Sequence, residues 1–439
     1  MPYITVRSPQ RSWRLAFSGD ALPLPHAKHD ERSQPAPVET PLVETPLRAE
    51  LDAGRQVQAR HYARQRQAFS LLNLLITAVV LAVLLFGGLS FALRDALGGV
   101  PGWQPFAGFA PARIAAYFLV LFAVSYVLEL PIVYYSGHVL PRRYGISTQR
   151  LGAWVWDLTK GLVLSLVLDL LAVAFLYALL AAFPTWWWLW AGLAVLLVTA
   201  LLANLAPVLL VPLFYKLTPL PEGEVREQAL RLAARTGTRV RGIYSMNLSA
   251  KTTAANAMVI GLGNTRRIVV GDTLLDRYAS DEIETVVAHE LGHQVHHDIP
   301  KLIAFETLTT LGGLLVVNLV LHAVVARVPA YHGLADPATM PLLGAALGVF
   351  FLVLLPLTNG FSRRVEHAAD VYALETTDKP AAFISAMTRL ANQNLAEVEP
   401  SPLVEFLLYS HPAVGRRLAF ARRYAASREG ASRATPSAG

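Results

Sequence analysis

The sequence contains no cysteine. This absence excludes disulfide bonds, thiolate metal sites and a cysteine nucleophile, so any bound metal ion must be held by His, Asp or Glu. Charged residues are also scarce: they make up 16% of the 439 residues, while 54% are hydrophobic and the mean hydropathy is +0.41. Such a composition is unusual for a soluble domain and predicts a chain embedded mostly in a membrane.

The chain also lacks a basic surface interleaved with aromatic residues, which is typical of nucleic-acid binding. The formal net charge is +7, but the arginines lie beside apolar runs and in the C-terminal tail. We therefore predict no nucleic-acid partner and interpret the arginines as determinants of membrane topology. The polar residues 1–67 contain no short apolar core of a cleavable signal peptide. Within them, we expect 1–57 to be disordered or loosely ordered.

Six apolar segments are long enough to cross a bilayer. They lie at about 68–93, 114–136, 161–183, 187–213, 302–326 and 340–360. Each could be the buried helix of a soluble core, but six such runs in one chain favour membrane spans. The sequence therefore predicts a mainly α, polytopic membrane protein whose partners include the lipid bilayer.

Lys and Arg concentrate on one side of the predicted spans. The basic flanks include Arg55, Arg60, Arg64, Arg66, Arg142, Arg143, Arg150 and Lys160. Because cytoplasmic loops carry an excess of Lys and Arg, both termini and the segment 214–301 are predicted to be cytoplasmic. An Arg- and Ala-rich, Lys-poor composition is common in bacteria with GC-rich genomes, so we expect an integral, multi-pass protein of the bacterial inner (plasma) membrane.

A soluble insertion separates the fourth and fifth spans. Helical spacing covers 222–236, short strands are expected at 240–248, 257–260 and 267–270, and a helix follows from about Ser280. The predicted organisation comprises spans one to four in 58–213, the α+β insertion in 214–301, spans five and six in 302–360, a cytoplasmic helical part in 361–425 and a disordered tail in 426–439.

The insertion carries the motif His289-Glu290-Leu291-Gly292-His293. On a helix, His289 and His293 lie one turn apart and face the same way, so both imidazoles can bind one zinc ion. Glu290 then stands beside the metal-bound water, where a general base is needed. The motif predicts a zinc-dependent hydrolase with its metal site on the helix that starts near Ser280.

A catalytic zinc ion needs a third protein ligand and an open position. His296, His297 and Asp298 are close in sequence. A third His six residues after His293, with a Gly between them, is excluded because the chain has His296 and Ile299 at those positions. We interpret His296 and His297 as solvated or supporting residues rather than ligands.

The better candidate for the third ligand follows the sixth predicted span. Glu366 and Asp370 share one helical face, so Glu366 can reach the metal while Asp370 holds the second nitrogen of a ligand imidazole. Arg363 or Arg364 could orient these carboxylates. The alternative is an exposed helix end crossed by salt bridges.

Together these motifs resemble the integral-membrane zinc CAAX prenyl proteases of type 1, in a group that also holds the HtpX-type membrane proteases. The resemblance covers about residues 58–425. It rests on the His289–His293 motif, Ser362 to Asp370, Asn256-Ala257, Pro207 to Leu220, and Ser410-His411-Pro412 with Arg416-Arg417-Leu418. Four spans before the metal helix favour the prenyl-protease type, because the HtpX type has two.

The resemblance implies a fold and a set of roles. About six membrane helices would surround a chamber capped by a small α+β domain of the HEXXH, gluzincin-like type. The resemblance implies that His289, His293 and Glu366 bind one zinc ion per chain, with Glu290 as the general base. Asp370 would support a ligand histidine, and His411 would lie near the oxyanion. Asn256-Ala257 would lie on an edge strand that pairs with substrate.

The predicted function is zinc-dependent endoproteolysis of peptide or protein substrates, with lipid-modified or membrane-associated chains as the candidates. One alternative is a quality-control protease of the HtpX type with broader cleavage. The bacterial composition slightly favours this broader role. Another class of function, a non-enzymatic transporter or channel, is compatible with acidic residues in the spans.

Overall fold

The computed structural model describes residues 49–99 and 109–434, all within one compact unit, Thr45–Gly439. Six helices in this part of the chain are long and apolar enough to cross a membrane, as the sequence predicts. They are α1 (Ala53–Phe86), α3 (Pro111–Tyr134), α5 (Leu151–Ala182), α6 (Trp187–Leu209), α11 (Asp298–Val325) and α12 (Met340–Thr377). The chain is therefore an integral, multi-pass membrane protein.

The ends of α1 differ from the predicted first span, 68–93. The helix starts at Ala53, where the Asp52 side chain accepts a hydrogen bond from the Arg55 N–H at 2.9 Å. It therefore begins inside the segment 1–57 that we expected to be loosely ordered, of which 1–48 lie outside the described residues. It ends at Phe86 because Gly88 adopts a left-handed conformation, φ 72°, which favours glycine. The separate helix α2 (Leu89–Ala96) follows.

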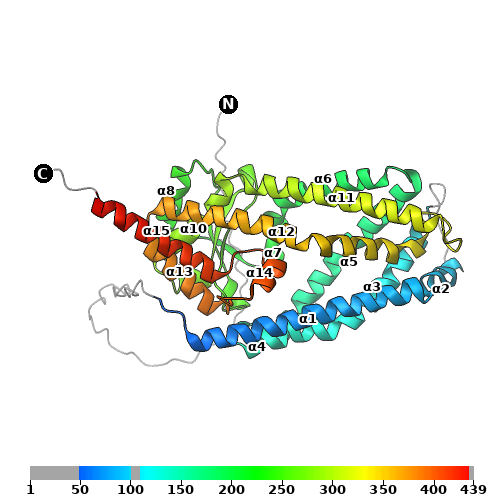
Figure 1. The fold of residues 1–439 in the computed structure, drawn as a ribbon, viewed down its shortest axis with the longest axis horizontal. Helices are drawn as coiled ribbons and strands as arrows, with labels where there is room; N and C mark the ends of the chain where they lie inside the picture. The colour runs from blue at the N-terminus through cyan, green and yellow to red at the C-terminus, as the bar shows by residue number, and fades with distance from the viewer. Residues whose placement is uncertain (1–48, 100–108, 435–439) are drawn as a thin grey trace, which may run out of the picture. The chain divides into compact units, whose positions relative to one another are not determined.

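The six spans contact one another in a closed cyclic order: α1, α3, α5, α6, α11, α12 and back to α1. Figure 1 shows these long helices running along one another. A π-helical turn, Tyr135–Val139, prolongs α3 into α4 (Leu140–Arg143), and α7 (Val211–Phe214) follows α6. Buried residues of the spans gather toward their ends, in one cluster around Trp187 and Leu321 and another around Tyr62 and Leu140. The chamber stays a prediction.

The insertion between α6 and α11 contains a four-stranded sheet. Its strands are β1 (Leu217–Pro219), β2 (Ile243–Met246), β3 (Ala257–Ile260) and β4 (Arg267–Gly271), in the order β1-β2-β4-β3. The β2–β4 pair is parallel, and the β1–β2 and β3–β4 pairs are antiparallel. β1 was not expected from the sequence, whereas α8 (Glu224–Arg235) matches the predicted helix 222–236. β3 lies at an edge of the sheet, as the resemblance implies.

The remaining helices pack around this sheet and the C-terminal part of α12. They are α9 (Asp272–Leu275), α10 (Ser280–Val295), α13 (Pro380–Gln393), α14 (Pro402–Leu408) and α15 (Val414–Ala434). The central helix is α10: its apolar residues, including Ile283, Val287 and Leu291, are buried in one core with β3, β4, α13 and α15. Because α15 continues to Ala434, the expectation of a disordered tail from 426 is wrong up to that residue.

Candidate metal centre

The two histidines of the motif lie side by side on α10. Their ring centroids are 5.0 Å apart and the rings are nearly perpendicular. His289 is buried, and His293 is partly buried. Because the helix has 3.6 residues per turn, the i, i+4 spacing alone places both imidazoles on one face. The relative position of the two histidines is therefore determined by local sequence spacing.

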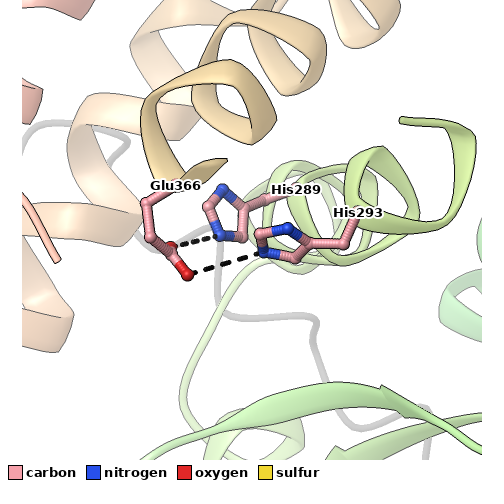
Figure 2. A group of neighbouring side chains, drawn as sticks. All are labelled: His289, His293 and Glu366. Carbon is pink, nitrogen blue, oxygen red and sulfur yellow. Dashed lines mark ion pairs between the residues drawn. The ribbon is translucent and has the colours of Figure 1, made fainter. Parts of the chain in front are cut away.

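Glu366 of α12 completes a group of three candidate ligands (Figure 2). One oxygen, Oε2, lies 3.3 Å from His289 Nε2, and the other, Oε1, lies 3.7 Å from His293 Nε2. One donor atom of each residue can be chosen so that all three lie within 4.8 Å of one another. The carboxylate therefore faces the ring nitrogens that remain free for a metal.

Close packing of α10 against α12 brings Glu366 to the histidines. Gly292 lies at the contact: a Cβ at this position would lie 3.3 Å from Ala369 Cα and 3.1 Å from Tyr372 Cδ1. Both contacts are tighter than side chains ordinarily make. The glycine inside the motif is thus explained by packing, since it lets the two helices approach closely enough for Glu366 to reach the site.

The donor set fits a divalent metal ion. Two imidazole nitrogens and a carboxylate oxygen are the ligands of many catalytic zinc sites. Glu366 Oε2 is buried; among the described residues it faces His289 Nε2 at 3.3 Å but makes no well-aligned hydrogen bond. A buried carboxylate oxygen without a well-aligned donor is costly, and a metal ion would compensate it.

Asp370 lies one turn beyond Glu366 and contacts the other nitrogen of His289. Its Oδ1 is 2.9 Å from His289 Nδ1, and only 1% of its side chain is exposed. Arg417 of α15 donates two hydrogen bonds to the same carboxylate, Nε to Oδ2 at 2.8 Å and Nη2 to Oδ1 at 2.6 Å. Asp370 is therefore held by one cation while it faces the imidazole.

His293 has a matching partner in Asp298. The His293 Nδ1 lies 3.0 Å from Asp298 Oδ2, and Asp298 is buried at the start of α11. Both histidines thus present Nε2 to Glu366 and Nδ1 to an aspartate. His296 packs its ring against Tyr372, and His297 Nδ1 lies 2.9 Å from the Val295 carbonyl, so neither belongs to the three-residue group.

Glu290 points toward the edge strand β3. The backbone N–H of Val259 is close enough to its carboxylate to favour the charged form. Burial raises the pKa of Glu290, and the negative charge of Glu366 adds to the increase, while His289, His293 and the Val259 N–H oppose it. A carboxylate whose pKa is raised toward neutrality is a better general base than an ordinary surface glutamate.

His411 reaches the same carboxylate from the loop between α14 and α15. Its Nε2 lies 3.2 Å from Glu366 Oε1, and its Nδ1 lies 2.9 Å from Ser410 Oγ. The structure thus brings His411 to the site, although His289 and His411 are far apart in sequence. Its side chain remains 60% exposed, so it is accessible to an incoming molecule.

Arg363 does not contact Glu366 or Asp370, and the expectation that it orients them is corrected. Its Nη1 donates to the backbone carbonyls of Glu405 at 3.0 Å and Tyr409 at 2.6 Å, at the end of α14. The physical reason is its position on α12: Arg363 shares a side of the helix with Asp370 but lies two turns, about 10 Å along the axis, before it, next to the end of α14. The arginine that holds Asp370 is Arg417.

Asn256 and Ala257 lie at the start of the edge strand. The Asn256 carbonyl accepts a hydrogen bond from Gly271 N–H at 2.8 Å, so this backbone oxygen is used within the sheet. In an antiparallel ladder, the next residue then directs its N–H and C=O away from the partner strand. The outward backbone groups of β3 therefore belong to Ala257 and Val259.

Sequence reasoning missed the roles of Arg417 and Asp298. A ligand histidine usually binds a carboxylate through its second nitrogen, so Asp298, five residues after His293, could have been assigned from this rule. Arg417 lies in the Arg416-Arg417-Leu418 motif, but only the packing of α15 on α12 distinguishes it from its neighbour.

Two family models match the chain. One is described as the CAAX prenyl protease N-terminal region with five membrane helices and matches residues 38–216. The other is described as peptidase family M48 and matches residues 219–425. Together they cover both the spans before the insertion and the part that carries the candidate metal centre.

Curated relatives and a solved structure agree with these matches. An uncharacterized metalloprotease, YhfN, of Bacillus subtilis is 28% identical over 94% of this chain and 92% of its own. The CAAX prenyl protease 1 of Saccharomyces cerevisiae is 28% identical over 85% of this chain and 86% of its own. The crystal structure of S. mikatae Ste24p has the same fold, with a TM-score of 0.75 and 24% identity over 86% of this chain and 91% of that one.

Proposed function

Because this chain belongs to peptidase family M48 and has the membrane-helix region of CAAX prenyl proteases, we propose that His289, His293 and Glu366 bind one catalytic zinc ion. The chain is a membrane metalloprotease that acts on peptide or protein substrates. The transporter or channel alternative is set aside, because the relatives are metalloproteases.

The observation that carries the zinc assignment is the convergence of three donor atoms from α10 and α12. The buried Glu366 Oε2 makes no well-aligned hydrogen bond with the described residues, and both imidazoles turn Nε2 toward Glu366. When bound, zinc supplies Lewis-acid chemistry: it lowers the pKa of a water and polarises the scissile carbonyl. Two imidazoles and one carboxylate are a ligand set that leaves a position open for this chemistry.

The residues around the ligands have separate roles in the proposed reaction. Glu290, whose pKa is raised by burial, accepts the proton of the attacking water and passes it to the leaving amine. His411 donates a hydrogen bond through Nε2 to the developing oxyanion, with Ser410 on its other nitrogen. Asp370 and Asp298 fix the orientation of the two ligand imidazoles.

The edge strand β3 offers a place for an extended peptide. The outward N–H and C=O groups of Ala257 can pair with a substrate backbone, while the Val259 N–H also contacts Glu290. Main-chain pairing of this kind holds a peptide whatever its side chains are. Asn256 contributes at the entrance of the strand, through its exposed side chain.

The basic flanks of the spans support a cytoplasmic active site. The regions rich in Lys and Arg all fall on the side of α10 when the six spans alternate in direction. Both termini would then be cytoplasmic, in a bacterial inner membrane. Reporters fused after Gly333 and Gly430 test this topology, because they should report opposite sides of the membrane.

The substrates that fit this site best are membrane-associated polypeptides, with a lipid-modified C-terminus as the preferred form. Relatives that cover most of the chain carry the name CAAX prenyl protease 1. Cleavage of a farnesylated peptide can be compared with cleavage of the same peptide without its lipid. Equal rates would favour the broader specificity of a quality-control protease.

Metal content and one substitution test the proposed mechanism. The purified protein should contain about one zinc ion per chain, and Glu366→Ala should lose it. Glu290→Gln should retain the metal and reduce peptide hydrolysis by about a hundredfold to ten-thousandfold, which is the range for loss of a general base. A Glu290→Gln variant that cleaves as fast as the parent would disprove the role of this residue.

A further inference from the structure

A separate groove lies on the face of α12 that points away from the metal centre. It has a volume of about 1100 Å³ and is lined by residues of α11, α12, α14 and α15. Leu357, Gly360 and Arg364 follow one another at helical spacing along this face, whereas Glu366 lies about 200° around the helix from Arg364. The groove therefore opens on another side of α12 than Glu366, although Arg417 and Pro412 of its lining adjoin Asp370 and His411.

One end of the groove is apolar and belongs to the membrane-spanning part of α12. Val353 and Leu357 line it and are 73% and 58% exposed. Phe305 of α11 stacks on Phe361 of α12 at a centroid distance of 4.5 Å and forms its wall. An exposed aliphatic surface of this kind is suited to acyl chains and not to water.

The other end of the groove is strongly basic. Five arginines and a single acidic residue, Glu405, are among its lining residues. Two of the arginines are already neutralised, because Arg417 binds Asp370 and Arg416 lies 3.1 Å from Glu405. Arg364 and Arg423 are exposed and form no hydrogen bond or ion pair with any residue in the described ranges.

The apolar and basic ends meet at the depth where the spans leave the membrane. α11 enters its apolar run near Phe305, and α12 leaves its apolar run near Phe361, at the mouth of the groove. A ligand in this position needs acyl chains along Val353 and Leu357 and a negative group at Arg364 and Arg423. This combination is the chemistry of an anionic phospholipid, and basic pockets beside membrane helices bind such headgroups.

We propose that the groove between α11, α12, α14 and α15 is a binding site for one anionic phospholipid. The guanidinium groups of Arg364 and Arg423 hold its phosphate, and its acyl chains lie against the exposed face of α12. This site is independent of the peptidase reaction, since neither arginine contacts the candidate ligands.

Lipid binding to the full-length protein in detergent tests the proposal. Native mass spectrometry can compare dioleoyl phosphatidylglycerol with dioleoyl phosphatidylcholine, which differ in headgroup charge and share acyl chains. The parent protein should bind phosphatidylglycerol more tightly. The double variant Arg364→Gln/Arg423→Gln should lose about thirty-fold in affinity, because each arginine near an anionic lipid contributes about a five-fold factor.

A matched control separates this site from general surface charge. The double variant Arg239→Gln/Arg422→Gln removes two exposed arginines that do not line the groove, and it should bind phosphatidylglycerol like the parent. Equal losses in both double variants, or no preference for phosphatidylglycerol in the parent, would overturn the proposal. So would competition by millimolar inorganic phosphate, which would indicate a site for a soluble anion. Unchanged zinc content in both variants would establish that their metal centres are intact.

Discussion

Arg417 of α15 holds both carboxylate oxygens of Asp370, at 2.8 Å and 2.6 Å, while Asp370 faces the Nδ1 of the candidate ligand His289. These contacts, from Arg417 through Asp370 to His289, connect α15 to the metal centre. Both side chains of this pair are largely buried, at 13% and 1% exposed, so neither charge is well solvated. The contact ties the metal centre to the packing of α15 on α12.

Replacing Arg417 with Gln should weaken metal binding and destabilise the fold. The substitution leaves Asp370 as a buried charge without its cation, which costs about 3–5 kcal/mol. Loss of an outer partner of a metal ligand typically lowers metal affinity about tenfold to a hundredfold. Zinc affinity by competition with a chelator and thermal unfolding measure the two effects.

An exposed arginine five residues further along α15, Arg422, gives the control for this prediction. Arg422→Gln should leave both quantities unchanged. The double variant Asp370→Asn/Arg417→Gln should recover part of the stability, because no buried charge remains, but not the metal affinity. Full recovery of zinc binding in this double variant would contradict the role of the Asp370 charge.

Asp298 should support His293 as Asp370 supports His289. Asp298→Ala removes the oxygen that lies 3.0 Å from His293 Nδ1 and should reduce zinc affinity about tenfold to a hundredfold. Lys301 lies 3.3 Å from the other oxygen of Asp298 and is 55% exposed, so Lys301→Gln should have little effect. Equal losses in the two variants would show that the helix start, and not the carboxylate, matters.

Metal binding should depend on pH through His289. Burial by itself lowers the pKa of this imidazole, but the contacts with Asp370 and Glu366 outweigh it and raise the pKa to about 9 in the metal-free protein. A bound metal needs the neutral ring, so zinc must displace a proton at any pH below that value. Zinc affinity should therefore rise about tenfold per pH unit between pH 7 and 8 and level off above pH 9.

The same shift determines how the metal-free fold responds to pH. A raised histidine pKa contributes stability that is fully present below the ordinary value of 6.5 and is lost as the pH rises through about 9. The increase in melting temperature on adding zinc should accordingly grow from pH 6 to pH 9. In Asp370→Asn this dependence should move to lower pH. An increase that is the same at every pH would rule out proton displacement from His289.

Arg363 should affect catalysis through the loop that carries His411. Its bonds to the carbonyls of Glu405 and Tyr409 fix the chain just before Ser410-His411. Arg363→Gln should lower kcat about tenfold with unchanged zinc content, because the oxyanion donor loses its position while the ligands do not. Steady-state kinetics in detergent can be compared with Arg364→Gln, which lacks these bonds. A loss of zinc in Arg363→Gln would contradict this explanation.

The prediction of six spans and of the helix with the metal motif was confirmed, because both depend on local patterns. A long apolar run can satisfy its backbone in lipid only as a helix. The ends of α1 and α15 were predicted less well, since polar parts of helices, such as residues 53–67 of α1, carry no apolar run. The strand β1 was missed because a strand of three residues is too short to show an alternation of apolar and polar residues.

The sequence by itself determined that His289 and His293 share a helix face and that Glu366 and Asp370 share another. It could not decide which arginine meets Asp370, or that Arg363 holds a loop instead of a carboxylate. Those contacts depend on the close approach of α10, α12 and α15 at Gly292 and Asp370. Packing between segments that are far apart in sequence produces no regular residue spacing from which the contacts could be predicted. Only the tertiary structure brings His411 and Arg417 to the candidate ligands.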